Sequence, residues 1–223
     1  MTKTEADTGN RFIRFLFNII CAFAVWISNI RVHVSGLDRI PSDGRFLLVS
    51  NHISAYDPIV TYHMLKNTGI RFVSKPENFK IPVCGFLMKK MGFMSIDREN
   101  ARNALKTVYE AADMIRDESI PVGIYPEGTR NKTPEKGLLK FHDGVFKIAK
   151  RAGVPVVVVT VSGTDKVAAN LPFKRSDVYL TVSDILPAEF VINSSDRDIG
   201  LRVRNAVELT LMKGSDEIVE KVS

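Results

Sequence analysis

Short apolar runs alternate with helical patterns along most of this chain. Each run holds about four to eight mostly apolar residues and ends at a turn rich in polar residues, glycine or proline, which is typical of a buried strand. Such runs lie at residues 46–49, 70–74, 93–96, 120–125, 154–161 and 178–182. Apolar residues at helical spacing predict helices at residues 57–67, 83–91, 99–117, 141–151 and 199–211. Because alternating strands and helices build parallel sheets, we expect an α/β fold with a mostly parallel central sheet flanked by helices.

The N-terminal segment has a different pattern. Residues 11–30 are the most apolar stretch, and the sixteen residues from 15 to 30 include only Asn18, Ser28 and Asn29 as strongly polar ones. A membrane-spanning helix usually needs roughly 20 apolar residues. A helix with basic flanks, here Arg11 and Arg31, can instead lie in the membrane interface. We therefore predict that residues 1–30 form a membrane-associating segment with an N-terminal helix, monotopic or a single anchor, at the cytoplasmic face of the cell membrane.

Two other interpretations of this segment are a secretory signal peptide and a helix buried in the core. Ala22-Phe23-Ala24 has the small-x-small form of a cleavage site, but apolar residues continue beyond it and acidic residues precede it. A buried core helix is also compatible with the length of the apolar stretch. A half-exposed strand is predicted after it, because residues 30–35 alternate in period two.

The composition is that of an ordinary globular protein. With 223 residues, 45% hydrophobic and 25% charged, residues 31–223 suit one domain with a full core. The net charge of +6 favours an anionic partner, but the basic residues are spread among acidic ones, which argues against nucleic acid. Cys21 and Cys84 both have apolar neighbours, so we expect small buried hydrophobic residues in a reducing compartment rather than a disulfide or a nucleophile.

The polar segment after the run at residues 46–49 carries the first candidate chemistry. His52 would lie at the carboxyl end of that strand, and Asp57 followed by Pro58 has the form of a helix N-cap. On one helix, residues five apart point about 140° away from each other, so the two side chains must meet across a loop. Asp57 would then accept from Nδ1 of His52 and leave Nε2 free as a base. A helix cap beside an ordinary loop histidine is the alternative.

Charged residues also follow three other predicted strands. The strand at residues 120–125 leads into a segment in which Gly128 lets the backbone approach a ligand and Arg130 offers a planar fork for phosphate. Asp97 and Arg98 follow the strand at residues 93–96, and Lys75 follows the strand at residues 70–74. Because the carboxyl ends of parallel strands meet at one edge of a sheet, we expect these side chains to gather near His52.

Four motifs in order resemble those of the lysophosphatidic acid acyltransferase family of glycerolipid acyltransferases. They are Asn51-His52-x-Ser54-x-x-Asp57-Pro58, Gly92-Phe93-Met94-Ser95-Ile96-Asp97-Arg98, Tyr125-Pro126-Glu127-Gly128-Thr129-Arg130 and Val154-Pro155-Val156-Val157-Val158. Tyr125 stands where the family often has phenylalanine, and Val158 stands where it often has a second proline. Four motifs in the expected order are a far more specific signal than any one alone.

The resemblance implies roles for these residues. His52 would be the general base, and Asp57 would hold its imidazole. Arg98 and Arg130 would bind the acceptor phosphate, and Glu127, Gly128 and Thr129 would shape the substrate pocket. Lys75 would add charge to that pocket or form a surface ion pair. The acyl donor would be acyl-CoA or acyl-carrier protein as co-substrate, with no metal and no other cofactor.

The implied activity is transfer of a fatty acyl group to the free hydroxyl of 1-acylglycerol 3-phosphate, giving phosphatidic acid in phospholipid synthesis. The partners would be membrane lipids, with lysophosphatidate as acceptor. No Gly-x-Ser-x-Gly motif is present, so no serine acyl-enzyme is implied. Two alternatives are the same chemistry on another lysolipid or glycolipid, and a membrane lipid-binding protein without turnover.

Overall fold

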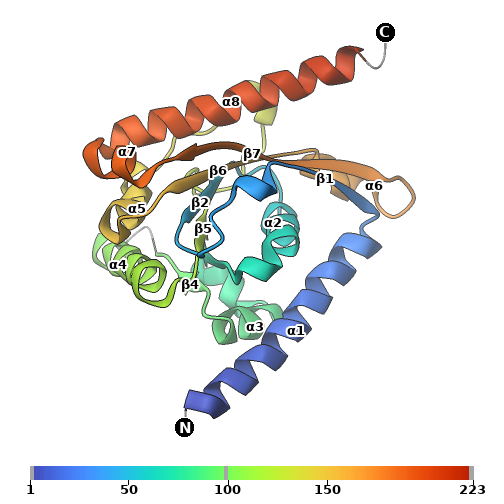
Figure 1. Cartoon of the computed structure of the whole chain (residues 1–223). Coiled ribbons are helices and arrows are strands. Elements are labelled where there is room, and N and C mark those ends of the chain that lie inside the picture. Colours follow the sequence, from blue (N-terminus) through green and yellow to red (C-terminus); the bar gives the residue numbers. More distant parts are fainter. Residues whose placement is uncertain (1–2, 98–99, 221–223) are drawn as a thin grey trace.

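The computed structural model describes residues 3–97 and 100–220. They fold into three layers, with a seven-stranded sheet in the middle and helices on both of its faces (Figure 1). The strand order is β1-β7-β6-β2-β5-β3-β4. The strands are β1 (Ile30–Ser35), β2 (Leu47–Ser50), β3 (Arg71–Ser74), β4 (Met94–Ser95), β5 (Val122–Ile124), β6 (Val156–Ser162) and β7 (Ser176–Leu186). The helices are α1 (Lys3–Ile27), α2 (Asp57–Leu65), α3 (Cys84–Lys90), α4 (Ala101–Glu118), α5 (Lys147–Ala152), α6 (Val167–Asn170), α7 (Ala188–Asn193) and α8 (Asp196–Glu220).

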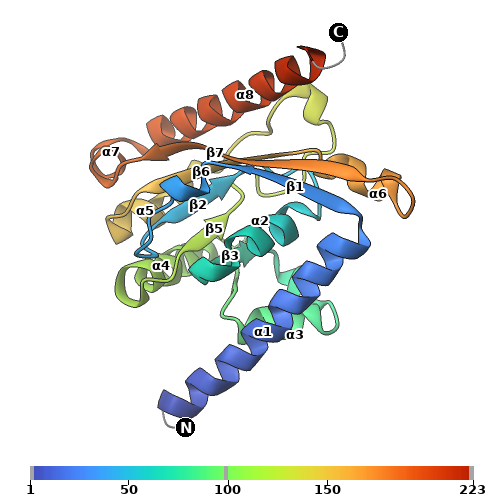
Figure 2. The same ribbon diagram turned by 45° about the vertical axis from the view of Figure 1, so that its right-hand side comes forward.

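The central strands are apolar throughout because they contribute side chains to two cores. In β2, Leu47 and Val49 face the core covered by α4, α5 and α8, whereas Leu48 faces the core covered by α1, α2 and α3. In β6, Val156 and Val157 divide in the same way. A strand buried on both faces needs apolar residues at every position, which explains the continuous runs in the sequence. Figures 1 and 2 show α8 and α1 on opposite sides of the sheet.

The predicted mostly parallel sheet is confirmed. Strands β6, β2, β5, β3 and β4 pair in parallel, so their carboxyl ends share one edge. Strand β7 is antiparallel to β6 and parallel to β1. The predicted last strand at residues 178–182 was too short, because alternate residues of β7 face solvent and their polarity hides the ends of the strand.

Several helix predictions were wrong in extent. Residues 143–146 form a 3₁₀ turn, and α5 begins only at Lys147, after a segment that contains Gly144. Helix α8 extends well beyond the predicted residues 199–211, and the hydroxyl of Ser195 just before it accepts from the backbone N–H of Asp198. Helices α6 and α7 were not predicted, since four and six residues are too few for a helical pattern to register.

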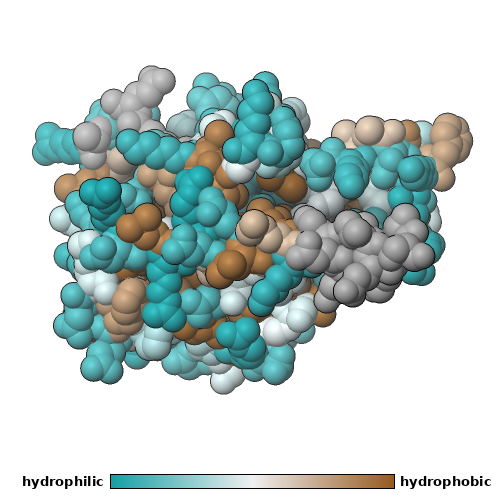
Figure 3. All heavy atoms as spheres, turned by 90° about the horizontal axis from the view of Figure 1, so that it is seen from above, coloured by the Kyte–Doolittle hydropathy of each residue, from teal (hydrophilic) through white to brown (hydrophobic). Residues whose placement is uncertain are grey.

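Helix α1 is longer than the apolar stretch that predicted it, and it has two different faces. Phe17, Cys21 and Val25 are buried against the domain, whereas Phe15 and Trp26 point outward and are exposed. Across residues 3–97 and 100–220, every helix falls short of the length or the apolar character needed to cross a bilayer. On the face of the molecule that carries α8, hydrophobic and hydrophilic side chains are interspersed (Figure 3).

Candidate active site

The loop after β2 is fixed to the neighbouring strand by Asn51. The side-chain amide of Asn51 donates to the carbonyl of Val161 and its Oδ1 accepts from the N–H of the same residue, both at 2.8 Å. These two bonds reproduce a backbone pairing beyond the end of β2 and bury the amide completely. The chain then leaves the sheet at His52, at the carboxyl edge.

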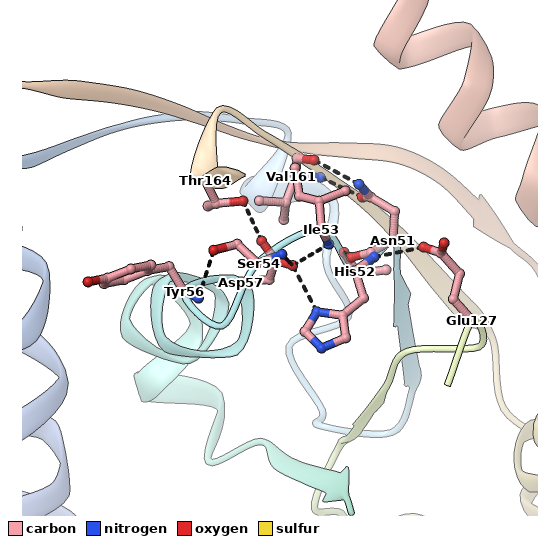
Figure 4. A network of polar contacts seen from close by, with 10 residues as sticks. Asn51, His52, Ile53, Ser54, Tyr56, Asp57, Glu127, Val161 and Thr164 are labelled. Carbon is pink, nitrogen blue, oxygen red and sulfur yellow. Dashed lines mark hydrogen bonds and ion pairs between the residues drawn. The ribbon is translucent and has the colours of Figure 1, made fainter. Parts of the chain in front are cut away.

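His52 meets Asp57 across the loop. The distance from Nδ1 of His52 to Oδ2 of Asp57 is 2.8 Å (Figure 4). A carboxylate can only accept, so Nδ1 carries the proton and Nε2 presents a lone pair. The imidazole is 17% exposed, and Nε2 points away from Asp57, without a hydrogen-bond partner among the described residues. This is the geometry of a base with its orienting group.

The carboxylate of Asp57 is fully buried and receives three further hydrogen bonds. Oδ2 accepts from the backbone N–H groups of Ile53 and Ser54, both at 2.7 Å, and Oδ1 accepts from the hydroxyl of Thr164. Four donors compensate the loss of solvation of the buried charge. The sequence prediction that Asp57 caps α2 was wrong. Tyr56 is the N-cap residue and has no side-chain cap bond. The carboxylate of Asp57 turns back onto its own loop instead of capping the helix.

Tyr125 supports one face of the imidazole. The ring centroids of His52 and Tyr125 are 4.5 Å apart and the ring planes differ by 28°, so the two rings stack. Tyr125 stacks in turn with Phe72 of β3, at 5.9 Å. Burial, followed by the nearby charge of Asp57, raises the pKa of Tyr125 well above its ordinary value. The phenol is therefore neutral, and it positions the imidazole by contact.

Glu127 binds the backbone on the other side of His52. Its Oε1 accepts from the backbone N–H of His52 at 2.8 Å, and its Oε2 accepts from the N–H of Leu139 at 3.0 Å. Burial raises the pKa of Glu127, and the two N–H donors act in the opposite direction. The carbonyl of His52 also accepts from the N–H of Asn131 at 2.7 Å. The segment after β5 thus holds the backbone of His52 through both its N–H and its carbonyl.

The remaining predicted residues lie farther from the imidazole. Gly128 turns the chain with a φ of 72°, a conformation that favours glycine, and Thr129 and Arg130 are exposed. Arg130 lines a cavity of about 500 Å³ whose wall includes residues 53–56 of the His52 loop, and Glu135 and Asp165 also line it. The imidazole of His52 lies outside this lining. Lys75 is exposed after β3 at the same sheet edge, and Arg98 lies outside the described residues.

The structure therefore brings Asp57 and Glu127 directly onto His52 and brings Arg130 to the loop that carries it. Thr164 was missed, since its only signal in the sequence was a polar residue shortly after the β6 run. The supporting roles of Asn51 and Tyr125 were missed as well, although both residues lie within the motifs.

The two cysteines lie on α1 and α3, and both are free. Burial raises the pKa of Cys21 to about 12, and burial also raises the pKa of Cys84. Neither is an activated thiolate. Within residues 3–97 and 100–220, no three His, Cys, Asp or Glu side chains gather closely enough to hold a metal ion.

The site lies in a segment that matches a known protein family. The family model described as Acyltransferase matches residues 31–162, which contain His52, Asp57, Glu127 and Arg130. The chain belongs to the acyltransferase family. The family predicted from the four motifs is thereby confirmed, and the matched segment begins at β1 and excludes α1.

Individual relatives of this acyltransferase come from bacteria and plastid-bearing organisms. A 1-acyl-sn-glycerol-3-phosphate acyltransferase of Chlamydomonas reinhardtii is 32% identical over 159 residues, covering 71% of this chain and 46% of that protein. The enzyme of the same name from Haemophilus influenzae is 29% identical over 187 residues, covering 82% and 76%. The chain thus spans less than half of the algal relative and about three quarters of the bacterial one.

A solved structure has the same fold. The crystal structure of the 1-acyl-sn-glycerophosphate (LPA) acyltransferase PlsC from Thermotoga maritima superposes with a TM-score of 0.72 at 22% sequence identity. The alignment covers 96% of this acyltransferase and 84% of the Thermotoga chain. This likeness therefore extends over nearly all of the chain, α1 and α8 included.

Proposed function

We propose that this acyltransferase moves a fatty acyl group from an acyl thioester to the free hydroxyl of 1-acylglycerol 3-phosphate, giving phosphatidic acid. The observation that carries the proposal is the His52–Asp57 pair, a partly exposed imidazole held by a buried carboxylate at the carboxyl edge of the sheet. The names of the relatives support the choice of acceptor. The thioester would be acyl-CoA or acyl-carrier protein, and no resident cofactor or metal would take part.

The reaction follows from the orientation of the imidazole. Nε2 of His52 accepts the proton of the glycerol hydroxyl while that oxygen attacks the thioester carbonyl carbon. Asp57 stabilises the imidazolium that forms, because its carboxylate already accepts from Nδ1. The C–S bond then breaks, and the imidazolium returns the proton to the departing sulfur. The acyl group passes directly to the acceptor, so no side chain of the enzyme needs to become acylated.

Arg130 is the proposed phosphate ligand of the acceptor. Its exposed guanidinium lies in the cavity beside the His52 loop, where a phosphate would find a planar pair of donors. Gly128 and Thr129 would shape the approach to it, and Glu127 would hold the two segments together. Lys75 and Arg98 would add positive charge at the same edge.

Substituting Arg130 tests this assignment. Arg130→Gln is expected to lower kcat/KM for lysophosphatidate by about 10- to 100-fold, since hydrogen bonds to charged groups contribute roughly 1.5–3 kcal/mol. Transfer to a monoacylglycerol, which has no phosphate, should change little. Both acceptors are assayed with acyl-CoA and with acyl-carrier protein. Arg197→Gln, which removes an exposed arginine of α8, is the matched control.

Equal losses on both acceptors would show that Arg130 does not recognise phosphate. If the wild-type enzyme prefers an acceptor without phosphate, the acceptor is a glycolipid or another lipid of that kind. Binding of lysolipid without product from either donor would instead favour a lipid-binding protein.

We further propose that α1 attaches the enzyme to the membrane surface. Its outer face exposes large apolar side chains, and the exposed Arg11 lies in the first half of the helix. The outer-face residues are Phe12, Phe15, Ile19, Phe23 and Trp26. A helix of this kind inserts its apolar face at headgroup depth, while basic residues bind anionic lipid. One face of α1 would thus pack on the domain, and the opposite face would insert into lipid.

Membrane attachment through α1 predicts a specific loss of lipid binding. Phe15→Ser is expected to weaken binding to anionic vesicles by about tenfold or more, because burial of one large apolar side chain contributes about 1.5–3 kcal/mol. Co-sedimentation with vesicles measures the partition. Leu209→Ser on α8 is the control, since Leu209 is 58% exposed and Phe15 is 61% exposed. Equal loss in both variants would exclude a specific role for α1.

A further inference from the structure

A cation occupies a core-facing position of α1. Arg14 precedes the buried residues Phe17, Cys21 and Val25 at spacings of three, seven and eleven, so it lies on the inner face of the helix. Its Nε atom is buried and has no hydrogen-bond partner among the described residues. Burying a guanidinium N–H group without a hydrogen-bond acceptor costs free energy, so a bound acceptor would stabilise this side chain.

A second guanidinium lies beside it. Arg71, the first residue of β3, is only 3% exposed, and its Nη1 donates to the carbonyls of Gly69 and Ile70. The backbone of Gly69 lies between the two arginines. A Cβ atom at Gly69 would stand 3.8 Å from Nη2 of Arg14, while the carbonyl of Gly69 accepts from Arg71. Burial and then the positive charge of Arg14 lower the pKa of Arg71.

The protein supplies little negative charge to this pair. The ion pairs within the described residues include neither Arg14 nor Arg71. The carboxylate of Glu118 at the end of α4 attracts Arg71, but it is exposed and forms no ion pair with it. Burial raises the pKa of Tyr62 to about 12, so the nearby phenol is neutral and donates to Asn18 instead.

We propose that Arg14 and Arg71 form a second phosphate-binding site, separate from the acceptor site at Arg130. Two guanidinium groups offer several N–H donors to the oxygens of one phosphate, and the anion would neutralise their repulsion. Gly69 and Gly92 both lie beside these side chains, since a Cβ at Gly92 would stand 3.6 Å from Nε of Arg71.

The location distinguishes this site from the catalytic one. Arg71 begins β3, whereas His52, Lys75 and Arg130 follow the ends of parallel strands, so the two sites lie at opposite edges of one sheet. Arg14 also lies on the helix whose outer face carries the exposed apolar side chains. A phosphate bound here would belong to a phospholipid headgroup beside α1 or would be free phosphate from solution.

Binding measurements on the full chain test this site without relying on catalysis. Calorimetric titrations use protein in a phosphate-free, nonionic detergent and the Arg130→Gln background, so that the proposed acceptor site does not contribute. Inorganic phosphate is one probe, and glycerophosphoglycerol, a soluble headgroup diester, is the other. Adding Arg14→Gln is expected to weaken phosphate binding about tenfold, the effect of one charge-assisted interaction. Tighter binding of the diester would assign the site to a headgroup, and tighter binding of inorganic phosphate would assign it to free phosphate.

Arg197→Gln is the matched control, because Arg197 lies on α8, is exposed and belongs to neither proposed phosphate site. Arg14→Lys keeps the charge and is expected to lose less affinity than Arg14→Gln, which separates charge from packing. The melting temperature of each variant reports whether α1 remains docked. Equal affinities of the Arg14→Gln and Arg197→Gln proteins would overturn the proposal, and so would absence of phosphate binding in the Arg130→Gln protein. Neither result would affect the acyl transfer assay.

Discussion

His52→Ala is expected to lower kcat for acyl transfer by about 10²- to 10⁴-fold, the usual contribution of a general base. The substitution removes the imidazole whose free Nε2 is proposed to accept the proton of the acceptor hydroxyl. Asp57 keeps its hydrogen bonds from Ile53, Ser54 and Thr164, so the loop should remain folded. Steady-state assays with lysophosphatidate and an acyl thioester measure the loss.

The chain contains a natural control for this experiment. His33 and Asp177 form another histidine–carboxylate pair, also at 2.8 Å, but both are exposed and lie on β1 and β7. His33→Ala removes the same chemical groups from a pair on the far strands of the sheet, so its kcat should match the wild-type value. Comparable losses in His33→Ala and His52→Ala would mean that the effect comes from the fold and not from proton transfer.

Asp57→Asn is expected to have the second largest effect, with kcat reduced by about 10²-fold or more. An amide has one oxygen, whereas the carboxylate uses both oxygens to accept four hydrogen bonds. Placing the NH₂ group against these donors leaves at least one donor unpaired. The neutral amide also no longer stabilises a charged imidazole. The unpaired donor should also destabilise the fold by about 1–3 kcal/mol. Assays of activity and of thermal unfolding measure the two effects.

Asp177→Asn is the corresponding control, because the Asp177 carboxylate is exposed and bonds to an exposed histidine. Its activity and melting temperature should remain close to those of the wild type. If Asp57→Asn kept full activity while it lost stability, Asp57 would be a structural residue and would not orient the base.

Local patterns predicted the framework of the fold well. Residues 46–49 and 154–161 stand out in the sequence because strands buried on both faces must be apolar at every position. Strand β7 was harder to delimit, since it buries only one face over most of its length. Helix α1 was recognised by its apolar residues, but the polar residues near its start concealed how far the helix extends.

The contact of His52 with Asp57 was predictable because only five residues separate them. The other partners of the site were not, since they come from distant parts of the chain. Thr164 lies 107 residues from Asp57, and Glu127 lies 75 residues from His52. Asp57-Pro58 matched a helix cap, but Thr164 and the loop N–H groups compete for the same carboxylate and hold it away from the cap position. Tertiary hydrogen bonds decided where that side chain points.

The neighbouring side chains of Arg14 and Arg71 illustrate a second limit of sequence patterns. In the sequence, Arg14 directly precedes the apolar residues 15–30, and Arg71 lies within the predicted strand at residues 70–74. Their proximity arises only when α1 packs across the end of α2, which brings Gly69 against both side chains. The sequence does not reveal that the side chain of Arg71 and the Nε atom of Arg14 are buried in the fold.

A single-turnover experiment tests most directly whether His52 is the general base. With enzyme in excess over the acyl donor, the observed rate does not depend on product release. Wild-type, His33→Ala and His52→Ala enzymes are mixed with labelled acyl thioester and saturating lysophosphatidate, and labelled phosphatidic acid is followed over time. We predict equal rates for the first two and a rate at least about 10²-fold lower for His52→Ala. Phosphatidic acid formed by His52→Ala at the wild-type rate would contradict the account.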